Sequence, residues 1–207
     1  TEFHRSYVIH NPVNTEEVHK KANEFCVALP HPCFIGAGRL TKSKGYAELV
    51  DIHAELIKDG QIHYIAILGD GPEKDSILQK IKNLGVEKSF LLLGNKINPY
   101  PYLKEADFFI HPSLRESYPM VILENMILNK PIISTNVGGI PEIIDNETDG
   151  ILVNYNKNEI FNAMKNFLTD SHLVEKIKNG TKKSSEKFDE HKIYQQVTEM
   201  LTSLYNQ

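Results

Sequence analysis

Two glutamates, Glu116 and Glu124, stand eight positions apart on either side of an expected helix start. The segment follows an apolar run over 107–111 that is typical of a buried strand. It contains Pro119, which is tolerated at a first helical position because its missing N–H is not needed there. Free N–H groups at a helix start carry about half a positive charge and suit a phosphate. The two glutamates, with an anion-binding helix start between them, could therefore hold an extended ligand with a central diphosphate and hydroxylated ends. A nucleotide sugar has this form.

A cationic loop follows the first expected strand of the core. Residues 36–45 begin like the dinucleotide fingerprint Gly-x-Gly-x-x-Gly, but Thr41 occupies the third glycine position, and no Gly-Lys-Ser/Thr sequence closes a P-loop. Arg39 offers a rigid fork of donors for phosphate oxygens, and Lys44 adds a point charge nearby. Taken alone, such a loop is more often a solvated connection between strand and helix, so it indicates phosphate binding only together with the glutamates.

The spacing of Glu116 and Glu124 argues against a glycosidase pair. Catalytic carboxylates of glycosidases lie roughly 5–10 Å apart, whereas eight helical positions rise about 12 Å. The two groups therefore fit the ends of an extended ligand better than one glycosidic bond. Each also has an ordinary explanation: Glu124 could be an exposed helix residue, and Glu116 a first-turn charge favoured by the helix dipole.

No metal site is predicted. The histidines lack the spacing of zinc ligands, and no Asp-x-Asp motif is present to chelate a metal with a diphosphate. His111, at the end of the strand before the glutamates, is expected to be packed or hydrogen-bonded rather than a catalytic base. Cys26 and Cys33 form neither a disulfide framework nor a metal quartet, so a reducing, intracellular setting is the default expectation.

Apolar patterns predict an α/β fold with a Rossmann-like parallel sheet of about six strands, helices on both faces and additional C-terminal helices. The runs expected to form strands are 34–38, 62–68, 90–93, 107–111, 131–135 and 150–153. We expect a linker segment over 1–33, which could hold a short strand over 7–10 and a helix ending near Ala22. The sheet core follows over 34–155, and helices over 156–207 pack on it. Special sequences follow five strands, so five loops should share the edge where such sheets bind ligands. These loops are 38–39, 69–72, 94–95, 113–116 and 138–139.

The composition is that of an ordinary globular domain, with 41% apolar residues. The formal net charge of −4 argues against nucleic-acid binding driven by overall charge. No apolar run approaches the roughly 18 residues of a membrane span, and no secretory signal is evident. Because the first residue is Thr1 rather than Met, we expect the sequence to be a piece of a longer protein.

Residues 111–142 carry a longer pattern in register: His-Pro-Ser, Glu-Ser-Tyr-Pro, Leu-Glu-Asn-Met, Pro-Ile-Ile-Ser-Thr and Gly-Gly-Ile-Pro-Glu. This pattern resembles the Glu-x7-Glu region of retaining glycosyltransferases of family 4, which have the GT-B architecture. The cationic loop is similar to the Gly-Arg-Leu…Lys-Gly element of that family. The resemblance covers residues 34–155 strongly, and it implies the C-terminal, donor-binding half of such an enzyme.

The resemblance implies roles for the matching residues. Arg39 and Lys44 would hold the donor diphosphate and stabilise charge on the leaving group, and Glu116 would bind sugar hydroxyls. The implied catalytic residues are Arg39, Lys44 and Glu116. The implied donor-binding residues are Gly38, Asn95, Lys96, Ile97, Ser117, Tyr118, Pro119, Met120, Val121 and Glu124.

Within that donor site, Glu124 would bind the ribose hydroxyls, and the loop 95–97 would line the base pocket largely through its backbone. The amides over 117–121 would hold the sugar and the distal phosphate. The family often has Phe-Gly after the first acid, where this sequence has Tyr118-Pro119. The proline removes one N–H from the expected amide contacts.

The implied reaction moves a sugar from a UDP-, GDP- or ADP-linked donor to a glycan or lipid-linked acceptor, without a cofactor or metal. Surface polysaccharide or lipopolysaccharide synthesis is the expected setting, in the cytoplasm or at the inner face of its membrane through peripheral association. The acceptor would bind a further N-terminal domain, so these residues alone should bind donor weakly and transfer nothing. The alternatives are a nucleotide-sugar epimerase of the same architecture and a non-catalytic nucleotide-binding domain. A nicotinamide oxidoreductase is disfavoured by the failed glycine fingerprint.

Overall fold

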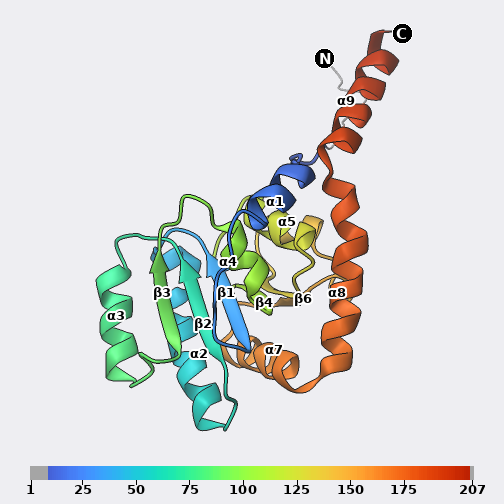
Figure 1. The fold of residues 1–207 in the computed structure, drawn as a ribbon. Coiled ribbons are helices and arrows are strands. Elements are labelled where there is room, and N and C mark those ends of the chain that lie inside the picture. Colours follow the sequence, from blue (N-terminus) through green and yellow to red (C-terminus); the bar gives the residue numbers. More distant parts are fainter. Residues whose placement is uncertain (1–8, 206–207) are drawn as a thin grey trace, which may run out of the picture.

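A computed structural model describes residues 9–205 and confirms the expected α/β architecture. Parallel strands form one six-stranded sheet in the order β3-β2-β1-β4-β5-β6 (Figure 1). The strands are β1 (Cys33–Ala37), β2 (Tyr64–Leu68), β3 (Phe90–Gly94), β4 (Phe108–His111), β5 (Ile132–Thr135) and β6 (Ile151–Val153). They are short and mostly apolar, as expected for a parallel sheet that is covered by helices.

Helices cover both faces of the sheet, and each face has its own apolar core. The helices that contribute buried side chains to one face are α2 (Tyr46–Lys58), α3 (Lys74–Asn83), α7 (Lys157–Thr169) and α8 (Ser171–Ser185). Those on the opposite face are α1 (Thr15–Ala22), α4 (Tyr100–Glu105), α5 (Met120–Ile127) and α6 (Ile140–Ile143). This layering explains why the strands lack the polar alternation of a sheet with one wet face.

Side-chain alternation along β1 shows how one short strand serves both cores. Phe34 packs with the α2 side of the sheet, whereas Cys33 and Ile35 pack on the α5 side, and all three side chains are fully buried. Successive residues of a strand point to opposite faces. The apolar type of three consecutive residues therefore follows from the two helical layers.

The segment before β1 contains a capped helix and is joined to the end of the domain by a backbone bridge. Asn14 caps α1, where its side-chain oxygen accepts a hydrogen bond of 2.7 Å from the Glu17 N–H. Val13 forms a parallel bridge with Asp189, which lies between the short 3₁₀ turn η2 (Glu186–Phe188) and α9 (Glu190–Tyr205). The beginning and the end of the described chain thus meet on one side of the domain.

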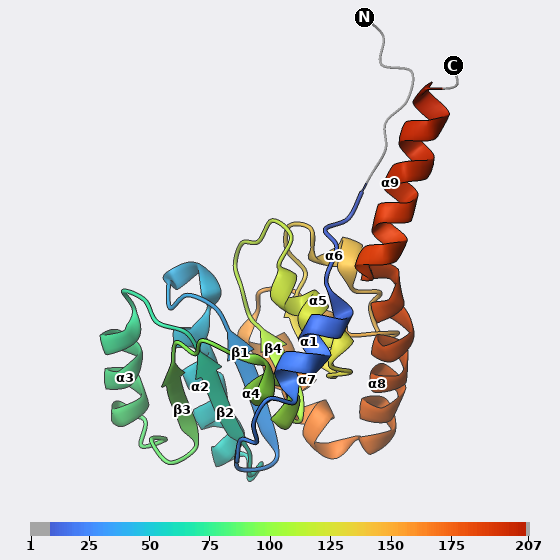
Figure 2. The ribbon, with the colours of Figure 1, turned by 45° about the horizontal axis from the view of Figure 1, so that its top comes forward.

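Helix α9 projects away from the rest of the domain (Figure 2). Ile193 is its single buried residue among those described, so most of α9 does not pack on the sheet core as α7 and α8 do. Its large apolar side chains that lie exposed are Tyr194, Leu201, Leu204 and Tyr205. Among residues 9–205, no helix is both long and apolar enough to cross a membrane.

Several predicted boundaries were wrong by one or two residues. Strand β1 begins at Cys33, one residue before the predicted start, and Ile62, predicted to lie in β2, is 78% exposed ahead of it. Two of the four residues of an expected strand over 7–10 fall outside the described residues, and its last two residues form no strand.

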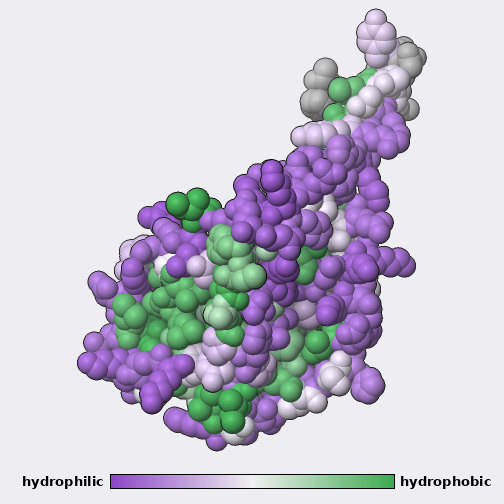
Figure 3. Space-filling view, viewed as in Figure 1, coloured by the Kyte–Doolittle hydropathy of each residue, from purple (hydrophilic) through white to green (hydrophobic). Residues whose placement is uncertain are grey.

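Figure 3 shows apolar surface over β2 and β3, where Tyr64 and Leu93 are only half-buried.

Candidate functional site

The candidate site lies at the carboxyl edge of the sheet, at the point where the strand order reverses. Strands β1 and β4 are neighbours, and from there the chain builds the sheet outward in opposite directions. The loops after β1 and β4 therefore begin at the position in the sheet where open α/β folds bind ligands. The cationic loop follows β1, and the first glutamate follows β4.

Backbone hydrogen bonds join the five loops of this edge. The loops after β1, β2 and β3 are joined by bonds from Gly38 N to Leu68 O (2.9 Å), Leu40 N to Asp70 O (3.0 Å) and Gly69 N to Gly94 O (3.0 Å). The loops after β4, β1 and β5 are joined by bonds from Leu114 N to Ser43 O (2.7 Å) and Gly139 N to Ser117 O (2.8 Å). The prediction that these loops share one edge of the sheet is thus confirmed.

Two glycines permit the closest approaches between these loops. Gly69 has φ 138°, and a Cβ there would clash with the carbonyl oxygen of Gly38. Gly138 has φ 56°, and a Cβ there would clash with the carbonyl oxygen of Glu116. Both the positive φ and the missing side chain are needed, so any other residue would force the loops apart.

Lys44, His111 and Glu116 form a charged cluster between the loops after β1 and β4. The Lys44 ammonium donates a hydrogen bond to Glu116 Oε1, and His111 Nε2 lies 2.7 Å from the same oxygen. The side chains of Lys44 and Glu116 are only 22% and 10% exposed. Burial alone would raise the pKa of Glu116, but hydrogen bonds from His111 and Lys44 lower it to about 2. Glu116 is therefore an anion held in a fixed position.

The ring of His111 is neutral and oriented by Glu116. The ring is buried, which lowers its pKa because the charged form loses its hydration, although the neighbouring carboxylate acts in the opposite direction. Since Glu116 can only accept, we assign the proton to His111 Nε2. Its Nδ1 has no partner within the described residues. This agrees with the expected packed, hydrogen-bonded histidine.

Glu124, the second acid, lies in α5 and contacts a different residue. Its Oε1 accepts a hydrogen bond of 2.9 Å from the Tyr100 hydroxyl, at the start of α4. Burial raises the pKa of Glu124, and the Tyr100 bond partly opposes that shift. Tyr100 was not predicted as a site residue. No local pattern links the tyrosine to a glutamate 24 residues away.

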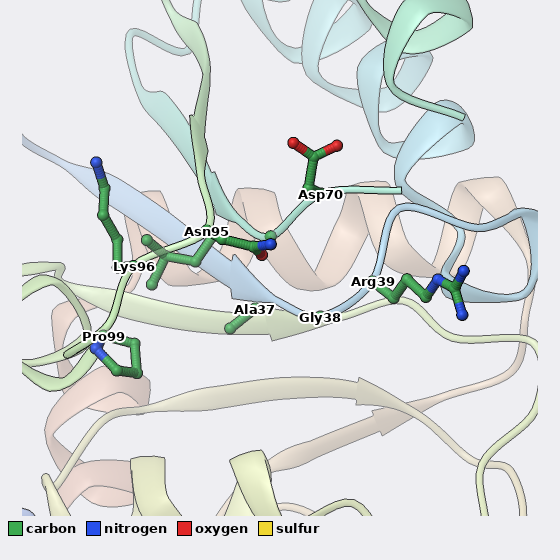
Figure 4. A pocket seen from close by; sticks show the side chains of 9 residues that line it. Ala37, Gly38, Arg39, Asp70, Asn95, Lys96 and Pro99 are labelled. Carbon is green, nitrogen blue, oxygen red and sulfur yellow. The ribbon is translucent and has the colours of Figure 1, made fainter. Parts of the chain in front are cut away.

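A pocket of about 450 Å³ opens at the ends of β1, β2 and β3 (Figure 4). Arg39 lies on one side of it and Lys96 on the other, with Asn95 between them. The residues that line it are Ala37, Gly38, Arg39, Leu68, Gly69, Asp70, Asn95, Lys96 and Pro99. The pocket adjoins the charged cluster, because a Cβ built on Gly38 would lie 3.6 Å from Lys44 Cε.

The predicted site residues do not all face this pocket. Ile97, expected beside Asn95 and Lys96, is fully exposed and does not line it. Asp70 was expected to tighten a turn, and its carboxylate does accept from the Gly71 N–H at 2.7 Å while it pairs with Lys74 at 2.9 Å. Pro119 precedes α5 at its N-cap position, and no side chain caps that helix.

The parallel sheet and its strand order define this domain as Rossmann-like, the fold class predicted above. The sequence profile described as "Glycosyl transferases group 1" matches residues 20–184. The chain therefore belongs to the glycosyl transferases group 1 family, and the predicted family relationship is confirmed.

Two curated relatives illustrate the similarity. The chain is 33% identical over 188 residues to the Campylobacter jejuni "N-acetylgalactosamine-N,N'-diacetylbacillosaminyl-diphospho-undecaprenol 4-alpha-N-acetylgalactosaminyltransferase". This match covers 90% of this chain and 50% of that protein. It is 33% identical over 129 residues to the Bacillus anthracis "N-acetyl-alpha-D-glucosaminyl L-malate synthase". This match covers 62% of this chain and 34% of that protein. The chain thus spans half or less of the length of these relatives.

Solved structures share the fold. Anabaena HepE in complex with UDP has a TM-score of 0.80 at 24% identity, over 95% of this chain and 57% of that chain. The C-terminal domain of the glycosyl transferase group 1 protein LpcC from Francisella tularensis has a TM-score of 0.71 at 22% identity, over 88% of this chain and 97% of that chain. The second comparison indicates that the fold described here corresponds to a C-terminal domain of such proteins.

Proposed function

We propose that this chain is the donor-binding domain of a retaining glycosyltransferase of family 4. The enzyme moves a sugar from a nucleoside diphosphate to a glycan or lipid-linked acceptor. The observation that carries this proposal is the position of the Lys44–His111–Glu116 cluster: it lies at the reversal of the strand order, beside a pocket lined by Arg39. A cationic loop, a fixed carboxylate and an open pocket together match the parts of a nucleotide sugar.

The diphosphate is assigned to the cationic side of the site. Arg39 and Lys44 lie in the loop after β1, and α5, whose start no side chain caps, follows the loop after β4. Positive groups that are already in place stabilise the charge that grows on a leaving diphosphate, and such stabilisation is often the largest catalytic contribution. We propose that they do so without a metal ion.

Glu116 is assigned to the donor sugar. Its pKa of about 2 keeps it ionised, so it can accept hydrogen bonds from sugar hydroxyls at any physiological pH. Binding of a diphosphate would draw Lys44 toward the phosphates, while His111 would still hold the carboxylate. Glu124 is assigned to the ribose hydroxyls, with Tyr100 fixing its orientation.

The comparisons suggest which ligands to test first. HepE was crystallised with UDP and with UDP-glucose. The Campylobacter relative is named for transfer to an acceptor sugar that is linked to diphospho-undecaprenol. A UDP-linked donor and a lipid-linked or glycan acceptor are therefore the preferred hypotheses. We propose a cytoplasmic location, with the acceptor bound by a further domain. The 207 residues alone should then bind donor weakly and transfer nothing.

Calorimetric titration with UDP-, GDP- and ADP-sugars tests the donor proposal. One nucleotide should bind clearly better than the others, and Arg39→Ala and Glu116→Ala should weaken that binding at least tenfold. Lys42→Ala is a matched control, because Lys42 lies in the same loop but outside the charged cluster. If both variants bind the best ligand like the parent, the assigned site is wrong. Interconversion of nucleotide sugars without an acceptor would instead indicate an epimerase.

A further inference from the structure

The segment before α1 contacts the loop that carries Glu116. His10 Nδ1 lies 3.0 Å from the Tyr118 hydroxyl, and the two rings stack with their centroids 5.7 Å apart and their planes 19° from parallel. Tyr118 follows Glu116 by two residues, and one edge of its ring lies against Gly139 in the loop after β5. Tyr118 therefore links His10 to two of the loops that form the site.

His10 is itself held by the junction between α8 and α9. Its ring meets that of buried Phe188 edge to face, with centroids 6.0 Å apart. The backbone nearby pairs with the same junction: Val13 N donates to Phe188 O at 3.0 Å, and Glu190 N donates to Val13 O at 3.2 Å. His10 is thus anchored on one side while it bonds Tyr118 on the other.

The Tyr118 hydroxyl is suited to donate this hydrogen bond. Burial, together with the negative charge of Glu142, raises the pKa of Tyr118 to about 12, so the hydroxyl keeps its proton. The bond also depends on the residue type, since a phenylalanine at this position would have no atom to offer His10. The ring stacking would survive that change, but the hydrogen bond would not.

We propose that His10 is a positioning residue, which acts through Tyr118 to hold the backbone of the 116–119 loop in its ligand-binding conformation. His10 need not touch a ligand for this role. A net hydrogen bond in a folded protein corresponds to roughly a two- to tenfold change in an equilibrium. Loss of the bond should therefore loosen the loop by about that factor. The statement that this loop binds a donor sugar rests on the proposed function. The positioning of the loop by His10 is independent of that function.

Hydrogen–deuterium exchange of the 207-residue chain tests the positioning directly. His10→Phe and Tyr118→Phe each keep an aromatic ring and remove one partner of the bond. Each should speed exchange of the Ile122 and Gly139 amides, which donate to Pro119 O and Ser117 O, by roughly two- to tenfold. The double variant should be no faster than the faster single variant. His10→Asn keeps a hydrogen-bond acceptor, Oδ1, next to Cγ as Nδ1 is in histidine, so it should restore part of the protection.

Matched controls separate this effect from general destabilisation. His172→Phe and Tyr194→Phe make the same chemical changes at exposed positions, and they should leave exchange of the Ile122 and Gly139 amides unchanged. Amides of α3, on the opposite face of the sheet, should exchange at the parental rate in every variant. If neither His10→Phe nor Tyr118→Phe alters the loop, or if their effects simply multiply, the proposed role of His10 is wrong.

Titration of the same variants with the best-binding nucleotide sugar then separates the two proposals. Weaker binding, by the factor seen in exchange, supports both. If the variants exchange faster than the parent but the parent binds none of the nucleotide sugars, the role of His10 stands and the donor assignment is overturned. Donor binding that is unaffected by variants with a loosened loop would show that the loop conformation does not matter for the ligand, and would overturn the ligand-binding part of the proposal.

Discussion

Replacing Glu116 by Gln should measure how much the charged cluster stabilises the folded chain. The pKa of Glu116 falls from its ordinary value of 4.5 to about 2 in the folded state. A shift of one pKa unit corresponds to about 1.4 kcal/mol, so the carboxylate contributes about 3 kcal/mol at pH 7. Because the folded pKa is the lower one, this stability is present above pH 4.5 and is lost as the pH falls toward 2.

Urea unfolding of four proteins provides the assay: the parent, Glu116→Gln, Lys44→Met and the double variant. Glu116→Gln should lower the free energy of unfolding by about 3 kcal/mol at pH 7, and by about 2 kcal/mol at pH 3.5. The two substitutions should not add, because each removes the partner of the same hydrogen bond. We expect a coupling free energy of at least about 1 kcal/mol for this largely buried pair.

The exposed pair of Lys157 and Glu55 is a matched control, since these side chains are 44% and 47% exposed. The same cycle with Glu55→Gln and Lys157→Met should give a coupling of about 0.5 kcal/mol or less, as is usual for surface pairs. Equal couplings at the two sites would refute the reasoning from burial. A Glu116→Gln variant as stable as the parent at pH 7 would refute the assigned pKa and the fixed carboxylate.

Three further predictions concern other groups. Burial beside another histidine lowers the pKa of His53 from 6.5 to about 3, so below pH 6.5 the unfolded chain binds a proton that the folded chain excludes. Unfolding free energy should thus fall by about 2 kcal/mol from pH 7.5 to 5, and by less in His53→Leu; equal slopes would contradict this. Gly138→Ala should lower the free energy of unfolding, measured by heat, by more than about 2 kcal/mol. Gly60→Ala is the control, since Gly60 has φ 84° and open space around it, and it should lower that free energy by about 1 kcal/mol. Similar losses in the two variants would count against the close packing of the loops. Tyr100→Phe should raise the pKa of Glu124 further, so the acid loss of nucleotide affinity should begin at higher pH; an unchanged pH profile would exclude a role for that contact.

The fold was predictable because its determinants are local. Apolar runs as short as 108–111 mark strands that are buried on both faces, and the turn residues after them mark the loops at one edge. The exact ends of strands were less predictable, since pairing with a neighbour decides them. Ile62 has a residue type that favours strands, yet β2 pairs with β1 only from Tyr64 onward.

The candidate site was predictable in outline but not in its contacts. A parallel sheet places the loops after β1 and β4 at the same edge, so the shared edge of Arg39 and Glu116 follows from topology. The salt bridge between Lys44 and Glu116 spans 72 residues of sequence, and no periodicity indicates it. The contact of His10 with Tyr118 spans 108 residues and depends on the packing of α8 and α9. The roles of all these residues in binding stay predictions.

The main-chain bonds between the loops limit how such a domain can acquire a new ligand preference. Because the loop after β1 is bonded to those after β2 and β4, and the loop after β4 to that after β5, a change of length in one would strain its neighbours. Specificity should therefore diverge through exchanged side chains on a preserved backbone. A chimera with a single transplanted loop is expected to fail unless the loop's bonded neighbour is transplanted with it.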